Sequence, residues 1–154
     1  MGCDIHAHLE VKLISKNFRD QVRAAITDEL RWHYYSPVKI ERNYEIFAKM
    51  AGVRNNGDIE PIAMPRGIPD DISLITRMNY EQLGSDGHSY SWLDVDELIE
   101  LKEFYKSTLS IGPLSQCPFL GVWVFRNEID DYKKYPDEFP PEVADIRLVF
   151  WFDN

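Results

Sequence analysis

Four residues near the start of this chain combine chemistry with regular spacing. Asp4, His6, His8 and Glu10 fall at every second position, and the residues between them are apolar. Side chains at every second position of a β-strand share one face, with Cα atoms about 6.5–7 Å apart. Two imidazoles at that spacing can ligate one metal ion at about 2.0–2.1 Å. The pattern predicts a strand over residues 3–13 that carries half of a metal site. An ordinary polar strand face is the alternative, since short His-x-His matches also arise by chance.

A further histidine, His88, lies in a segment that could complete this metal site. Asp86 opens an Asp-Gly turn. Ser91 and Asp94 have the spacing of a capping box, which predicts a helix over residues 91–105. His88 would then precede a helix N-terminus, where the dipole disfavours imidazolium and keeps the ring able to ligate a metal. The helix amides and the neighbouring serines could instead hold a phosphate.

These two stretches together lead to the hypothesis of a metal-dependent hydrolase. The candidate ligands for Zn, Mn or Fe are His6, His8, Asp86 and His88. The candidates for a further ligand or for the general base that activates a metal-bound water are Asp4 and Glu10. The candidates for binding a phosphate-bearing substrate such as a nucleotide are Arg54, Arg66, Ser89, Ser91 and Trp92. The hypothesis assumes that the two histidine stretches meet in space.

Two other functions compete with the hydrolase, so whether the chain is an enzyme stays open. In a binding module without turnover, aromatic side chains and arginines would sequester a nucleotide or dock on a host protein. Such a module would show a pocket with aromatic side chains and arginine but no convergent His/Asp cluster. The weaker alternative is a nucleophilic Cys3. In a regular strand Cys3 points away from His6 and His8, so its base would have to come from another element.

Composition and charge narrow the class of protein. With 154 residues, 44% of them hydrophobic and 13% aromatic, the chain suits a single globular domain over residues 1–154 and argues against disorder. The net charge of −9 argues against broad nucleic-acid binding. No secretion signal is visible, and the apolar run over residues 119–125 is too short for a membrane span. We therefore expect a cytoplasmic protein in which Cys3 and Cys117 are reduced.

Hydrophobic periodicity predicts an α+β fold. The expected strands are 3–13, 30–35 and 145–152, and the expected helices are 43–51, 70–83 and 91–105. Asn43 and Gly52 suit the two ends of the first helix. Residues 14–29 suit either a helix or a hairpin. Because strands and helices are grouped rather than alternating, we expect a mainly antiparallel sheet packed against about three helices. The last strand is apolar on both faces, which favours a central position.

Several stretches together resemble a family of small bacteriophage and prophage proteins. They are MGCDIHAHLE, RNYEIFAKMAGVRN, PRGIPDDIS, GSDGHSYSWL and VFWFDN. The resemblance covers residues 1–12, 32–101 and 145–154, and it leaves 15–29 and 106–143 as variable insertions. It implies a phage-encoded accessory protein inside a bacterial host cell, of a class that often interferes with host metabolism or defence. The activity of the family is not established, so the resemblance implies no catalytic residue.

Overall fold

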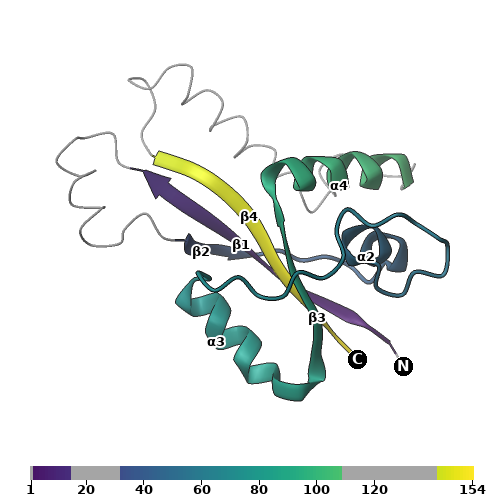
Figure 1. Ribbon diagram of the computed structural model, residues 1–154, viewed down its shortest axis with the longest axis horizontal. Coiled ribbons are helices and arrows are strands. Elements are labelled where there is room, and N and C mark those ends of the chain that lie inside the picture. The colour runs from purple at the N-terminus through teal and green to yellow at the C-terminus, as the bar shows by residue number, and fades with distance from the viewer. Residues whose placement is uncertain (1, 15–31, 109–141) are drawn as a thin grey trace.

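A twisted four-stranded sheet forms the centre of the computed structural model, which describes residues 2–14, 32–108 and 142–154 (Figure 1). Every pairing in it is antiparallel, and the strand order is β2-β1-β4-β3. The strands are β1 (Asp4–Ile14), β2 (Trp32–Pro37), β3 (Gly87–Asp94) and β4 (Glu142–Asp153). The apolar residues on both faces of β4 are buried between β1 and β3, so its predicted central position is confirmed.

Helices cover both faces of this sheet in the described part of the chain. They are α2 (Tyr44–Ala51), α3 (Leu74–Leu83) and α4 (Val95–Thr108), with the short 3₁₀ turn η1 (Gly84–Asp86) between α3 and β3. Figure 1 shows α2 and α4 on one side of the strands and α3 on the other. The predicted α+β class is therefore confirmed. None of the helices in the described ranges combines the length and apolar character that crossing a membrane needs.

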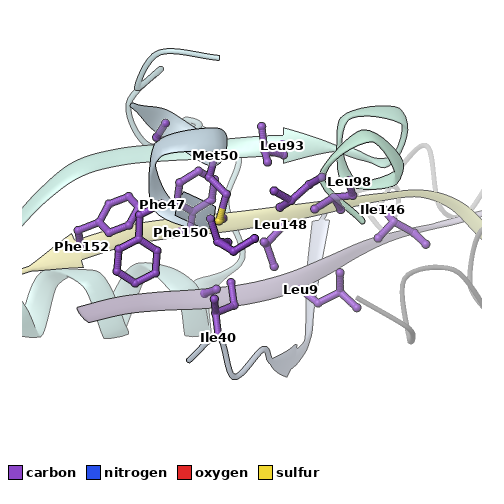
Figure 2. Packing of buried hydrophobic residues seen from close by; sticks show 14 of the residues in the cluster. Leu9, Ile40, Phe47, Met50, Leu93, Leu98, Ile146, Leu148, Phe150 and Phe152 are labelled. Atoms are coloured by element: carbon purple, nitrogen blue, oxygen red, sulfur yellow. The ribbon is translucent and has the colours of Figure 1, made fainter. Parts of the chain in front are cut away.

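The apolar core lies between the sheet and the pair α2 and α4. Figure 2 shows Phe47 and Met50 of α2 directed at β4, where Leu148 and Phe150 are fully buried. The rings of Phe47 and Phe152 meet edge to face at 5.1 Å. Burying one such side chain stabilises the fold by about 1.5–3 kcal/mol relative to leaving it exposed. This layer fixes the position of α2, and with it the position of the loop that follows α2.

The predicted ends of α2 are confirmed in atomic detail. The side-chain Oδ1 of Asn43 accepts hydrogen bonds from the backbone N–H groups of Glu45 and Ile46, at 3.0 and 3.2 Å. At the other end Gly52 has φ +70, and its N–H donates to Ala48 at 2.8 Å. Most residues avoid this left-handed conformation, which explains a glycine here.

The predicted helix over 91–105 is wrong in its first residues, because a better cap lies three residues later. Asp94 and Glu97 form a reciprocal capping box, each backbone N–H donating to the other side chain at 2.9 Å. The helix therefore begins at Val95, and Ser91 belongs to a strand that the sequence did not predict. Similarly, Ser73 caps α3, so that helix begins after the predicted residue 70.

Some predictions fall outside the described residues. These are the alternatives for residues 15–29, the apolar run over residues 119–125 and the state of Cys117. Cys3 is a free thiol, as expected.

Candidate functional site

The register of the sheet places the two histidine stretches on opposite faces. His6 pairs with Trp151 of β4, whereas His88 pairs with the next residue, Phe152, and stacks on its ring at 6.0 Å. Neighbouring residues of one strand point to opposite faces. His88 therefore does not share the face of His6 and His8, and the predicted convergence of these three rings is wrong. In the ranges that the structure describes, no group of three or more His, Cys, Asp or Glu side chains is arranged to hold a metal ion.

His6 and His8 have structural partners on the α3 face of the sheet. His6 contacts Asp153 at 3.0 Å and stacks on Trp151, at 5.8 Å between ring centroids. His8 is buried, and its Nδ1 lies 3.2 Å from the hydroxyl of Thr76 in α3. Burial holds the pKa of His8 below its ordinary value, against an opposing effect of the Glu10 carboxylate. This ring therefore stays neutral at neutral pH and helps to fasten α3 to the sheet.

Each of the two predicted catalytic carboxylates forms an ion pair with an arginine. Glu10 is fully buried, and it accepts hydrogen bonds from the Ser73 N–H at 2.7 Å and from Arg147 at 2.9 Å. Asp4 is exposed and accepts two hydrogen bonds from Arg42, at 2.8 and 2.6 Å. The hydrogen bonds from Arg42 hold the pKa of Asp4 below its ordinary value, and Glu10 is enclosed away from any substrate, so neither carboxylate is well placed to act as a general base.

Of the predicted substrate-binding residues, three are held together at the edge of the sheet. Arg66 forms a bidentate ion pair with Glu97, and its guanidinium lies over the ring of Trp92 at 4.7 Å. The buried hydroxyl of Ser91 accepts a hydrogen bond from the Arg66 N–H at 3.2 Å. These contacts tie the loop before α3 to β3, and the charge of Arg66 is already neutralised. Asp86, in η1, is exposed and belongs to none of these groups.

Arg54, His88 and Ser89 do come together, in a cavity of about 410 Å³ beside the C-terminal end of α2. We call this cavity the Arg54 pocket; its walls are Ala51, Gly52, Val53, Arg54, Met64, Pro65, His88, Ser89 and Asn154. Cavities of about 300–1,000 Å³ are typical of small-molecule sites. The side chains of the wall include a cation, a hydroxyl, an imidazole and an amide, but no carboxylate.

The partners of Arg54 in the described chain are neutral. Its Nη2 donates to the side-chain Oδ1 of Asn154 at 3.0 Å, and its guanidinium lies close enough to the thiol of Cys3 to oppose the rise of that thiol's pKa. By contrast, Arg42, Arg66 and Arg147 are each paired with a carboxylate. An arginine whose charge is not cancelled by an acidic side chain can bind an anion in two parallel hydrogen bonds.

His88 reaches the pocket through an irregularity in β3. Between His88 and Ser91 the strand has one residue more than β4, which is the pattern of a β-bulge, and Ser89 has φ +51. The Ser89 hydroxyl lies 2.9 Å from His88 Nδ1, and His88 Nε2 is buried with no hydrogen-bond partner among the described residues. Arg54 also has a positive φ, +54. Non-glycine residues in this conformation cost about 1–3 kcal/mol each and cluster at binding sites.

Cys3 does not have the properties of a nucleophile. Its side chain is fully buried, and burial raises the pKa of the thiol, although the nearby guanidinium of Arg54 opposes this. The thiol therefore stays protonated and closed to a substrate, and the side chain is part of the buried apolar core.

Comparison with known protein families, with curated proteins and with solved structures gave no match. The geometry of the site therefore carries the functional argument.

Sequence reasoning missed two groups of residues that matter here. Asn154 contributes its amide to the Arg54 pocket, and Asp71, Ser73 and Thr76 complete the polar contacts beneath α3. No local spacing marks either group, since each is brought to its partner by strand pairing or by the docking of α3. The one signal for Asn154 is the resemblance to phage proteins, because its motifs include both VFWFDN, which ends at Asn154, and DGHS, which contains His88 and Ser89.

Proposed function

We propose that this protein is a binding module that holds a small phosphate-bearing anion in the Arg54 pocket without turning it over. The observation that carries the proposal is a guanidinium with neutral side-chain partners, in a cavity that no acidic side chain of the described residues lines. Ser89, His88 and Asn154 would add hydrogen bonds around the anion. In the part of the chain that the structure describes, no three His, Cys, Asp or Glu side chains gather as the hydrolase hypothesis needs, which supports binding over metal-assisted hydrolysis.

The other arginine without a carboxylate partner among the described residues supports the choice of pocket. Arg77 donates to the backbone carbonyl of Asp70, and it lines a hollow under α3 that also contains the carboxylate of Asp71. A carboxylate near an anion repels it, by about 1 kcal/mol at 4 Å even in water. Among the residues that the structure describes, no acidic side chain lines the Arg54 pocket, so this source of repulsion is absent from its wall.

The proposal is tested by titrating inorganic phosphate into the protein while following its backbone amides by NMR. We expect saturable shifts at residues 52–54, 88 and 89. Arg54→Ala should weaken binding at least about tenfold, because a hydrogen bond to a charged group contributes about 1.5–3 kcal/mol. Arg77→Ala is the matched control, since it removes the same charge from another hollow. Equal losses in the two variants, or no saturable shift at all, would reject the proposal.

A second measurement addresses turnover. A nucleotide incubated with the protein and Zn²⁺ or Mn²⁺ should be recovered intact by phosphorus NMR. Release of phosphate that depends on His6 or His8 would restore the hydrolase hypothesis in place of the binding module.

The resemblance to phage proteins bears on where such a ligand would come from. It is the basis for proposing that the anion belongs to the bacterial host, and that the protein acts by sequestering it in the cytoplasm. Docking on a host protein is the alternative, and it does not require the Arg54 pocket.

A further inference from the structure

A second hollow adjoins the Arg54 pocket, with Arg54 in the wall of both. It measures about 420 Å³ and is lined by one side of α2 and by the loop after it. We call it the Tyr44 hollow; its walls are Tyr44, Glu45, Ala48, Arg54, Asn55, Asn56, Gly57 and Ile59. Arg54 is the residue that the two linings share, so a ligand bound at Arg54 can contact both hollows at once if it is longer than a phosphate.

The walls of the Tyr44 hollow are built before any ligand arrives. The side chain of Asn55 closes the loop, donating to the carbonyl of Ile59 at 2.7 Å and accepting from its N–H at 2.9 Å. The ring of Tyr44 rests against Phe47, at 5.9 Å between centroids, and Phe47 is fully buried in the core. A preformed wall costs little ordering entropy on binding.

The two cavities differ in chemistry. The Arg54 pocket presents a cation and neutral hydrogen-bonding groups, whereas the Tyr44 hollow presents an aromatic ring and the exposed carboxylate of Glu45. The carboxylate repels an anion but accepts hydrogen bonds from hydroxyl or amino groups. An aromatic ring offers a stacking surface to a planar group, and such stacking is tolerant of the identity of the base.

We infer that the ligand is a nucleotide-like phosphate ester, whose phosphate lies in the Arg54 pocket and whose sugar and base lie in the Tyr44 hollow. This inference rests on the proposed function and assigns the ligand class that the proposal leaves open. A phosphate alone would leave the second hollow unused, and a ligand with phosphates at both ends would meet Glu45.

The test compares inorganic phosphate, adenosine and adenosine 5′-monophosphate on the full chain, by calorimetry and amide NMR. The monophosphate should bind at least about fivefold more tightly than phosphate, since stacking of one base contributes at least about that factor. Its shifts should extend to residues 44, 45 and 56, and adenosine alone should bind more weakly than the monophosphate.

A variant of Tyr44 distinguishes binding in the Tyr44 hollow from binding in the Arg54 pocket. Tyr44→Leu keeps an apolar contact with Phe47 but removes the ring, so it should lower affinity for the monophosphate to that for phosphate and leave phosphate binding unchanged. Tyr35→Ala, at a tyrosine on β2 with 54% exposure, is the control. If Tyr44→Leu binds the monophosphate as the wild type does, or if the monophosphate is no tighter than phosphate, the inference is wrong while the proposed function stands. Absence of phosphate binding would instead overturn the proposed function.

Discussion

His6 and His88 lie on opposite faces of the sheet, because they pair with Trp151 and Phe152, two consecutive residues of β4. This relationship divides the chemistry of the protein. On the α3 face the polar residues of β1 bind β4, α3 and the residues before α2 and α3, and these contacts are structural. On the α2 face His88 joins Arg54 and Ser89 in a cavity. We therefore expect substitutions on the α3 face to change stability and substitutions around the cavity on the α2 face to change binding.

The ion pair of Glu10 with Arg147 should contribute strongly to stability. Both side chains are buried, at 0% and 7% exposure, and the pair also holds α3 through Ser73 and Asp71. Glu10→Gln should lower the free energy of unfolding by about 3–5 kcal/mol, because it leaves the charge of Arg147 buried without its main partner. Urea denaturation followed by circular dichroism measures this loss.

The exposed pair of Asp4 and Arg42 provides the matched control. Asp4→Asn should leave the free energy of unfolding nearly unchanged, because solvent screens a pair at the surface. Similar losses in Glu10→Gln and Asp4→Asn would show that the buried pair contributes no more than an exposed one.

Shortening a side chain in the core beneath α2 should lower the stability of the fold. Phe47 is fully buried and contacts Phe152. Phe47→Ala should lower the free energy of unfolding by about 3–5 kcal/mol through lost burial and the cavity that remains. Met78→Ala, at a side chain with 53% exposure, should change it by no more than about 0.5 kcal/mol. A small effect of Phe47→Ala in the same denaturation experiment would contradict the position of α2 described above.

Elements with strong local signals were predictable from the sequence. The alternation in residues 3–13 predicted the strand and its apolar face, although His8 and Glu10 on the polar face are buried as well, and Asn43 and Gly52 predicted the ends of α2. The central position of the last strand followed from its two apolar faces. In each case the signal depends only on neighbours in the chain, so one sequence contains it.

Features that depend on register or on competing local signals were not predictable. Ser91 and Asp94 have the spacing of a cap, but Asp94 and Glu97 form a better one, and that choice turns Gly87–Asp94 into a strand. In a strand, a shift of one position moves a side chain to the other face. The face of His88 therefore depended on pairing with β4, which the sequence does not specify.

Cys3 should react slowly in the folded protein. Its burial both shields the thiol and raises its pKa, so little thiolate forms at neutral pH. In a Cys117→Ser background, the reaction with Ellman's reagent at pH 7.5 should become fast only when urea unfolds the chain. Reaction of the folded protein at the rate of the unfolded one would show that Cys3 is accessible and would return it to the candidates for a nucleophile.

His8 should make stability depend on pH in a defined window. Burial lowers its pKa in the folded protein below the ordinary value of 6.5. The stability contributed by the neutral ring is therefore fully present above about pH 7.5. It is lost as the pH falls through 6.5, because the unfolded chain then binds a proton that the folded chain does not.

His8 can lower the free energy of unfolding by at most about 1.4 kcal/mol per pH unit. This decrease ends once the pH is below the pKa of His8 in the folded protein. The carboxylates of Asp71 and Glu97, whose pKa values lie below the ordinary 3.8 and 4.5, do not titrate in this window. Urea denaturation at pH 7.5, 6.5 and 5.5 measures the slope. His8→Gln can still hydrogen-bond Thr76 but cannot titrate. The free energy of unfolding of this variant should therefore change less between pH 7.5 and 5.5 than that of the wild type. The same slope in both proteins would mean that another group causes the pH dependence and that His8 is not held neutral beneath α3.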